Sequence, residues 1–234
     1  MNNEPILCTA HRGLWDDTTP QNTIEAIAKA YAAGAEWVET DFNEEPDGAI
    51  LCYHDDGVRA KIKPPFKVPT LAEVMALVPS NGGLQCEIKK YGPTYAAKFD
   101  AAVRKAGLGP ENITVSSFSA EALTDFHRRY PDYKAILLFC AKTEGPDNLI
   151  DLARKEGFWS LCPGCETLRG KWKPEDAEKI RAAGFDFRVW GVNSPESLAL
   201  AAEFGAAAFT CNFYETAFVW ASQLHIALRP KIVR

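Results

Sequence analysis

Residues 187–213, FRVWGVNSPESLALAAEFGAAAFTCNF, show the repeating unit of this chain in its plainest form. The run at 187–193 has the length and apolar character of a buried strand. The run at 194–205 carries apolar residues at helical spacing and ends in Gly205, where the residue after a helix is commonly glycine. The run at 207–213 is a second apolar strand. Strand, helix and strand in this order predict a β–α–β unit, from which parallel sheets are built.

The same alternation extends over nearly the whole chain. Eight such strand–helix units in 234 residues predict an α/β fold, the (β/α)8 TIM barrel, as a single domain over residues 1–234. A doubly wound open sheet is the alternative, although no GxGxxG follows any strand. The predicted strands are 5–10, 37–42 (with 47–55 as an excursion), 84–89, 113–118, 134–140, 158–163, 187–193 and 207–213, and the predicted helices are 23–34, 70–78, 93–107, 119–130, 146–157, 173–184, 194–205 and 214–225.

The composition of the chain excludes several classes of protein. The net charge of −5 argues against sequence-independent binding of nucleic acid, which requires a basic face. No apolar run approaches 18 residues, so no transmembrane span is expected. The N-terminal residues lack the basic and apolar regions of a signal peptide. We therefore expect a cytoplasmic protein whose partner is a small molecule.

Seven cysteines are present, and most of them lie in apolar runs, which indicates buried, reduced thiols. Cys162 and Cys165 form the one CxxC motif. It is interpreted as two thiols in a loop; a redox pair or half of a zinc site is the less favoured alternative, because no second CxxC exists.

Polar residues interrupt the apolar strands near their carboxyl ends, which is where barrels place their chemistry. Glu39 and Asp41 are two residues apart on one predicted strand, and Glu87 and Lys89 are two apart on the next, so each pair shares a face. Three converging carboxylates would repel one another without a cation. Oxygen ligands favour Mg²⁺ or Ca²⁺, so we expect one divalent cation here; surface carboxylates paired with Lys or Arg are the alternative.

Two of the four histidines also fall at strand ends. His11 ends the first predicted strand and His54 ends the excursion, so both are candidates for an acid–base pair. Arg12 and Lys89 add positive charge at the same mouth. A cation, two cationic side chains and two histidines favour a phosphodiester as the substrate. His127 and His225 are expected on helices away from this mouth.

These motifs together resemble the glycerophosphodiester phosphodiesterase family. The resemblance covers nearly the whole chain, and the order HRG, ExD, HD and ExK is specific even though each piece is weak alone. It rests on HRG at 11–13, PQNT at 20–23, GAEWVETD at 34–41, DGAILCYHD at 47–55, EIK at 87–89, VSSF at 115–118 and VWGVN at 189–193.

The resemblance implies a (β/α)8 barrel with one divalent metal, Mg²⁺ or Ca²⁺. It implies a role for each candidate residue and a substrate class, the glycerophosphodiesters. It also implies that Phe118 and Trp190 line the alcohol part of the substrate. The implied metal ligands are Glu39, Asp41 and Glu87; the acid and base are His11 and His54; the phosphate-binding residues are Arg12 and Lys89.

Two features depart from the family pattern. Gln21 stands where the family usually has Glu, which keeps a hydrogen-bonding group but removes a charge. The insertion after the second strand region is also short: residues 58–69, VRAKIKPPFKVP, read as an active-site loop or trimmed cap with four cationic residues. A shorter cap predicts a more open mouth.

The expected reaction is metal-dependent hydrolysis of a glycerophosphodiester to an alcohol and sn-glycerol 3-phosphate. One histidine takes a proton from water or from a neighbouring substrate hydroxyl, and the other protonates the leaving alkoxide. Two other functions stay open: a phospholipase D-like enzyme acting on lysophospholipids or another phosphodiester, and a non-catalytic barrel that binds phosphate esters. A sugar isomerase is disfavoured, since no Gly-rich phosphate loop follows the last two strands.

Overall fold

The computed structural model describes residues 4–140, 145–170 and 172–233. Its strands form one sheet in the order β1-β9-β8-β7-β6-β5-β4-β2-β3, and pairing of β1 with β2 closes the sheet into a barrel. The predicted (β/α)8 barrel is confirmed, and the open doubly wound sheet is wrong. The strands are β1 (Leu7–His11), β2 (Trp37–Glu44), β3 (Ile50–Cys52), β4 (Gly83–Lys90), β5 (Ile113–Ser117), β6 (Lys134–Phe139), β7 (Ser160–Pro163), β8 (Asp186–Val189) and β9 (Ala208–Cys211).

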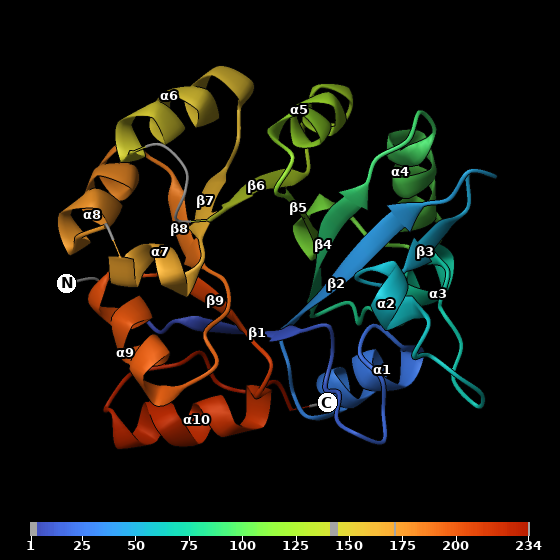
Figure 1. Cartoon of the computed structure of the whole chain (residues 1–234), viewed down its shortest axis with the longest axis horizontal. Coiled ribbons are helices and arrows are strands. Elements are labelled where there is room, and N and C mark those ends of the chain that lie inside the picture. Colours follow the sequence, from blue (N-terminus) through green and yellow to red (C-terminus); the bar gives the residue numbers. More distant parts are fainter. Residues whose placement is uncertain (1–3, 141–144, 171, 234) are drawn as a thin grey trace.

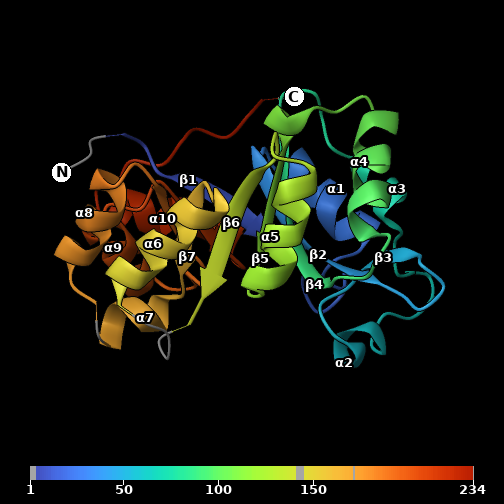
Figure 2. The same ribbon diagram turned by 90° about the horizontal axis from the view of Figure 1, so that it is seen from above.

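Helices surround the barrel, as Figure 1 shows, and most of them join one strand to the next. In Figure 2 the arrow of β6 points toward the end of the barrel at which the two short helices α2 and α7 lie. The helices are α1 (Ile24–Ala32), α2 (Asp56–Arg59), α3 (Leu71–Met75), α4 (Tyr95–Lys105), α5 (Ala120–Arg129), α6 (Pro146–Glu156), α7 (Cys165–Gly170), α8 (Pro174–Ala182), α9 (Pro195–Glu203) and α10 (Tyr214–Gln223), and a 3₁₀ turn spans Pro110–Asn112.

The apolar residues divide into two groups because strand side chains alternate between the two faces of the sheet. On β6, Leu137 and Phe139 belong to the large core between the barrel and its helices. Ile136 and Leu138 belong instead to a small cluster with Cys162. The small cluster therefore lies inside the barrel, and Trp190 packs against it.

The first half of β2 pairs with β1, and its last three residues pair with the antiparallel strand β3. The predicted excursion at 47–55 is thus confirmed, although only Ile50–Cys52 is a strand. Gly48 has φ of 79° in the turn that precedes β3, a conformation that favours glycine. The hairpin returns the chain toward β2 and leaves His54 just beyond β3.

Local signals place most helix ends correctly. The side chain of Thr23 caps α1, and Thr70 and Glu73 form a capping box at α3. Two helices were not predicted: α2, which overlaps the start of the trimmed cap, and α7, which begins at the second cysteine of the CxxC motif. Both are short, four and six residues, so they offer little periodic signal. Among the described residues, none of the helices has the length and apolar character to cross a membrane.

Candidate active site

Eight of the nine site residues predicted from the sequence line one cavity of about 190 Å³. The ninth, Asp41, is fully buried behind it, beside Glu39 and Glu87. A larger open groove, about 770 Å³, runs beside α5 and shares Lys89, but the histidines do not line it. Its charged groups also pair with each other, as Arg128 does with Glu156 at 2.7 Å. The smaller cavity is lined by His11, Arg12, Glu39, His54, Gln85, Glu87, Lys89, Phe118, Leu138, Trp190 and Thr210.

Three carboxylates meet at the base of this cavity. Glu39 and Asp41 come from β2, and Glu87 comes from β4, where the register sets it directly beside Asp41. All three are buried, and one oxygen from each lies within 4.8 Å of the others. Oε2 of Glu39 and Oδ1 of Asp41 have no hydrogen-bond partner among the described residues. Buried oxygens without a partner are costly, so this arrangement suits a bound cation.

The pKa values of the carboxyl groups also favour a bound cation. Burial, followed by repulsion from Asp41, raises the pKa of Glu87 to about 7. Burial, with repulsion from Asp41 and Glu87, also raises the pKa of Glu39 well above its usual value. Without a cation, Glu39 and Glu87 therefore keep their protons to a higher pH than isolated carboxyl groups do. The donor set consists only of oxygens, which fits a hard divalent ion such as Mg²⁺ or Ca²⁺.

Arg12 follows β1, where it can contact both the carboxylates and the cavity. Its Nε lies 3.1 Å from Oδ2 of Asp41, and its guanidinium donates to Oε1 of Gln21 at 2.5 Å. The expected hydrogen bond of Gln21 is therefore present. The next residue, Gly13, has φ of 85°, and a Cβ there would lie 2.5 Å from the backbone of Ala26. The HRG motif thus needs its glycine so that the turn can pack on α1.

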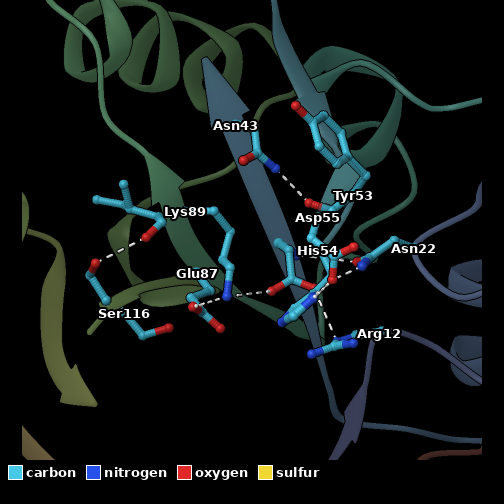
Figure 3. Close-up of polar contacts among 12 residues, drawn as sticks. Arg12, Asn22, Asn43, Tyr53, His54, Asp55, Glu87, Lys89 and Ser116 are labelled. Atoms are coloured by element: carbon cyan, nitrogen blue, oxygen red, sulfur yellow. Dashed lines mark hydrogen bonds and ion pairs between the residues drawn. The ribbon is translucent and has the colours of Figure 1, made fainter. Parts of the chain in front are cut away.

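Lys89 brings a second cation to the same cavity. Its Nζ donates to Oε1 of Glu87 at 2.8 Å and lies 4.0 Å from Oδ1 of Asp41. In Figure 3 the side chains of Glu87, Lys89, His54 and Arg12 point toward a common space. Positive charge therefore borders the carboxylates from two strands, β1 and β4.

The two histidines have different partners. Nδ1 of His11 lies 2.5 Å from Oδ1 of Asn212, and its Nε2 lies 3.6 Å from Oε2 of Glu39. Burial, then the positive charge of Arg12, lowers the pKa of His11 to about 4. Nδ1 of His54 instead contacts the carboxylate of Asp55 at 2.6 Å, and this side chain is 30% exposed. Both rings are partly exposed, 23% for His11 and 30% for His54, so both can meet a molecule in the cavity.

The opposite side of the cavity is apolar. The rings of Phe118 and Trp190 meet edge to face, with centroids 5.4 Å apart, and Leu138 lies beside them. The indole N–H of Trp190 donates to the carbonyl of Phe139 at 3.1 Å. Behind the indole lies Gly164, where a Cβ would stand 2.6 Å from the ring. The aromatic pair is thus fixed in place while Phe118 stays 44% exposed.

Some residues of the site were not singled out from the sequence. Asn22, which immediately precedes the N-cap of α1, donates to Oδ2 of Asp41 at 2.8 Å and accepts the backbone N–H of Asp41. Its φ of 60° lies in the left-handed region, which asparagine adopts more readily than most residues. The local sequence gives no signal for this contact. Gln85 and Leu138 are likewise found only in the structure. Thr210 and Asn212 are among the polar residues at predicted strand ends, but the sequence assigns them no role.

The remaining sequence motifs lie apart from the carboxylates. Cys162 lies on β7 and Cys165 begins α7, so the interpretation as loop thiols was wrong, although both are buried free thiols. Burial raises the pKa of Cys165 to about 11, which leaves it unreactive near neutral pH. Among the described residues, the carboxylate cluster is the one group suited to a metal. His127 lies on α5 as predicted, whereas His225 follows the end of α10.

Comparison with known proteins identifies the family of this chain. The model of the glycerophosphoryl diester phosphodiesterase family matches residues 11–63 and 58–216. The chain belongs to this family. A glycerophosphodiester phosphodiesterase of Bacillus subtilis strain 168 is 22% identical over 91% of this chain and 85% of its own length. The resemblance noted in the sequence is confirmed.

Solved structures share the fold. A glycerophosphodiester phosphodiesterase from Parabacteroides distasonis is 21% identical, with a TM-score of 0.79, covering 95% of this chain and all of the other. A phosphodiesterase from Oleispira antarctica, solved in complex with its product sn-glycerol 3-phosphate, is 19% identical with a TM-score of 0.77, covering 92% of this chain and 96% of the other. Both agree with the closed barrel.

Proposed function

We propose that this protein hydrolyses glycerophosphodiesters to an alcohol and sn-glycerol 3-phosphate with the help of one divalent cation, Mg²⁺ or Ca²⁺. The observation that carries the proposal is the convergence of three buried carboxylates with two cationic side chains and two histidines in one cavity. Membership of the family supports it. The product bound to the Oleispira relative supplies the substrate class.

Glu39, Asp41 and Glu87 would hold the cation, since Glu39 and Asp41 each keep a buried oxygen that accepts no hydrogen bond from the described residues. A cation bound there would act as a Lewis acid and stabilise negative charge on the phosphoryl group. Asn22 would keep Asp41 oriented through its two hydrogen bonds. Hydrogen bonds of this kind fix the geometry of metal ligands.

Arg12 and Lys89 would bind the phosphoryl oxygens. Both border the carboxylates, and both are anchored by ion pairs to Asp41 or Glu87. The anchored guanidinium still has donors for a phosphate oxygen, and the ammonium contributes a point charge. These groups stabilise charge as it grows in the transition state.

His11 and His54 would exchange the two protons of the reaction. One takes the proton of the nucleophile, either water or a neighbouring substrate hydroxyl that would first give a cyclic phosphate. The other donates a proton to the leaving alkoxide, so the alcohol departs neutral. Each transfer is typically worth about 10²–10⁴-fold in rate. Phe118 and Trp190 would line the alcohol part of the substrate, on the side away from the carboxylates.

The test is release of sn-glycerol 3-phosphate from glycerophosphocholine with Mg²⁺, with Ca²⁺ and with EDTA. We expect release with a cation and none with EDTA. His11→Gln and His54→Gln are each expected to lose about 10²–10⁴-fold in kcat. His127→Gln is the matched control, because His127 lies on α5 outside the cavity. Near-normal turnover in either site variant would contradict the acid–base roles.

Lysophosphatidylcholine is the second substrate to test. The exposed ring of Phe118 extends the apolar side of the cavity toward solvent, where an acyl chain could rest. Activity on this lipid alone would replace the proposed substrate class with the lysophospholipids. A folded protein that binds the cation but turns over neither substrate would favour a phosphate-ester-binding role.

A further inference from the structure

Two asparagines beyond the ends of the last two strands are linked to His11, the last residue of the first strand: Asn212 contacts it directly and Asn193 contacts Asn212. Asn212 directly follows β9, and its Oδ1 lies 2.5 Å from Nδ1 of His11. Asn193 lies beyond the end of β8, and its Oδ1 accepts the backbone N–H of Asn212 at 2.8 Å. The three residues form a chain of hydrogen bonds across the seam between β8, β9 and β1, which are neighbours in the closed sheet.

The chemistry of this contact determines which ring nitrogen carries the hydrogen. An amide oxygen only accepts hydrogen bonds, so Nδ1 of His11 must be the donor. A neutral imidazole with its hydrogen on Nδ1 has its lone pair on Nε2. That nitrogen lies 3.6 Å from Oε2 of Glu39, beside the carboxylate cluster.

We propose that Asn212, held by Asn193, is a positioning residue that keeps His11 as the Nδ1–H tautomer, with the Nε2 lone pair directed into the cavity. The catalytic consequence rests on the proposed function, since a lone pair there can accept a proton from a bound nucleophile. The tautomer itself does not depend on any activity.

A comparison with His54 shows what an amide, rather than a carboxylate, contributes as the partner of His11. His54 contacts the carboxylate of Asp55, which can pair with either a neutral or a positively charged ring. The amide of Asn212 carries no net charge, so it orients the ring of His11 through a hydrogen bond alone. The two histidines of the cavity are therefore held by chemically different partners.

The test is long-range ¹H–¹⁵N NMR of the ¹⁵N-labelled, metal-free protein near pH 8. The chain has four histidines, and the signals of His11 are the set that His11→Gln removes. We expect the Nδ1–H pattern for His11 in the wild type. In Asn212→Ala the acceptor at Nδ1 is lost while Oε2 of Glu39 stays near Nε2, so we expect a mixture or the Nε2–H form. Asn212→Asp keeps an acceptor oxygen and is expected to restore the Nδ1–H form.

Asn112→Ala is the matched control. This asparagine also ties backbone segments together, accepting from Gly109 and donating to Gly82, but it lies in the turn before β5 at the other end of the strands. It is expected to leave the His11 signals unchanged. Asn193→Ala removes the acceptor of the Asn212 backbone N–H, so we expect a partial shift of His11 from the Nδ1–H form to the Nε2–H form.

Kinetics then separate the inference from the proposed function. Loss of a partner that orients such a ligand or base typically costs about 10–100-fold in activity, and here we expect it in kcat with little change in KM. An Nε2–H pattern in the wild type, or an unchanged pattern in Asn212→Ala, would overturn the inference. Absence of turnover on every phosphodiester, with the Nδ1–H pattern present, would overturn the proposed function alone.

Discussion

The two sides of the cavity are built in different ways. The charged side comes from β1, β2 and β4 and the segment after β3, all within the first 90 residues. The apolar side comes from β6 and from the segments that follow β5 and β8. The charged side consists of His11, Arg12, Glu39, Asp41, His54, Glu87 and Lys89, and the apolar side consists of Phe118, Leu138 and Trp190.

The charged side is held by contacts between side chains. Asp41, for example, is contacted by three other side chains, those of Asn22, Arg12 and Lys89. The apolar side is held by packing and by the backbone: the indole of Trp190 rests against Gly164 and donates to a carbonyl. This difference indicates that catalysis and selection of the alcohol can be altered separately. The predictions below test that separation.

The largest effect is expected from Glu39→Gln on the charged side. The variant should lose cation binding and at least about 10³-fold in kcat, since metal catalysis supplies several kcal/mol. In the metal-free protein it should also raise Tm, by about 2–4 °C for each kcal/mol of repulsion removed, because buried like charges destabilise the fold. Calorimetry and turnover measure both.

Glu36→Gln is the control for this change. Glu36 precedes β2 and pairs with Arg229 at 3.2 Å, outside the cavity. It should change neither cation binding nor kcat. A metal-free Glu39→Gln protein that is less stable than the wild type would contradict the repulsion between the carboxylates.

Cation binding should depend on pH. Burial and Asp41 raise the pKa of Glu87 from 4.5 to about 7, so a proton competes with the cation below that pH. Affinity should therefore fall as pH falls, by roughly tenfold for each pH unit below 7 if one proton is displaced. Titration calorimetry in two buffers of different ionisation enthalpy counts the released protons; constant affinity between pH 8 and pH 5 would refute the raised pKa.

On the apolar side, Gly164→Ala should affect KM rather than kcat. A Cβ at this position would stand 2.6 Å from the indole of Trp190, which would push the ring toward Phe118. Overpacking typically costs about 1–3 kcal/mol, so we expect KM for glycerophosphocholine to rise about 5-fold or more. Inhibition by sn-glycerol 3-phosphate should not change, because it lacks the alcohol part.

Gly170→Ala is the matched control, since a Cβ there meets nothing within 4 Å. Its KM should equal that of the wild type. A Gly164→Ala enzyme that loses kcat and product binding together would show that the two sides of the cavity are coupled after all.

The smallest effect is expected at Gln21. Gln21→Glu keeps an acceptor for the guanidinium of Arg12, so kcat/KM should change less than about 2-fold. Gln21→Ala removes the acceptor, and the loss of one hydrogen bond should lower kcat/KM by about 2–10-fold. Equal effects of the two substitutions would show that the side chain of Gln21 does not position Arg12.

Much of the site was predictable because it is locally encoded. Glu39 and Asp41 share a face of β2 through the two-residue period of a strand, and the parallel register then places Glu87 beside Asp41. The short helices α2 and α7 were missed, because four to six residues are too few to show helical periodicity. The CxxC motif was misplaced for the same reason.

The alternation of strands and helices, the family and the candidate residues of the charged side could be predicted from the sequence, because hydrophobic period and motif order are local properties of a chain. Which distant side chains touch depends instead on how the barrel closes. Asn212 lies 201 residues from His11 and reaches it only because β9 pairs with β1 when the barrel closes. Gly164 likewise supports Trp190 only because β7 and β8 are neighbours in the sheet, and no local pattern records that contact.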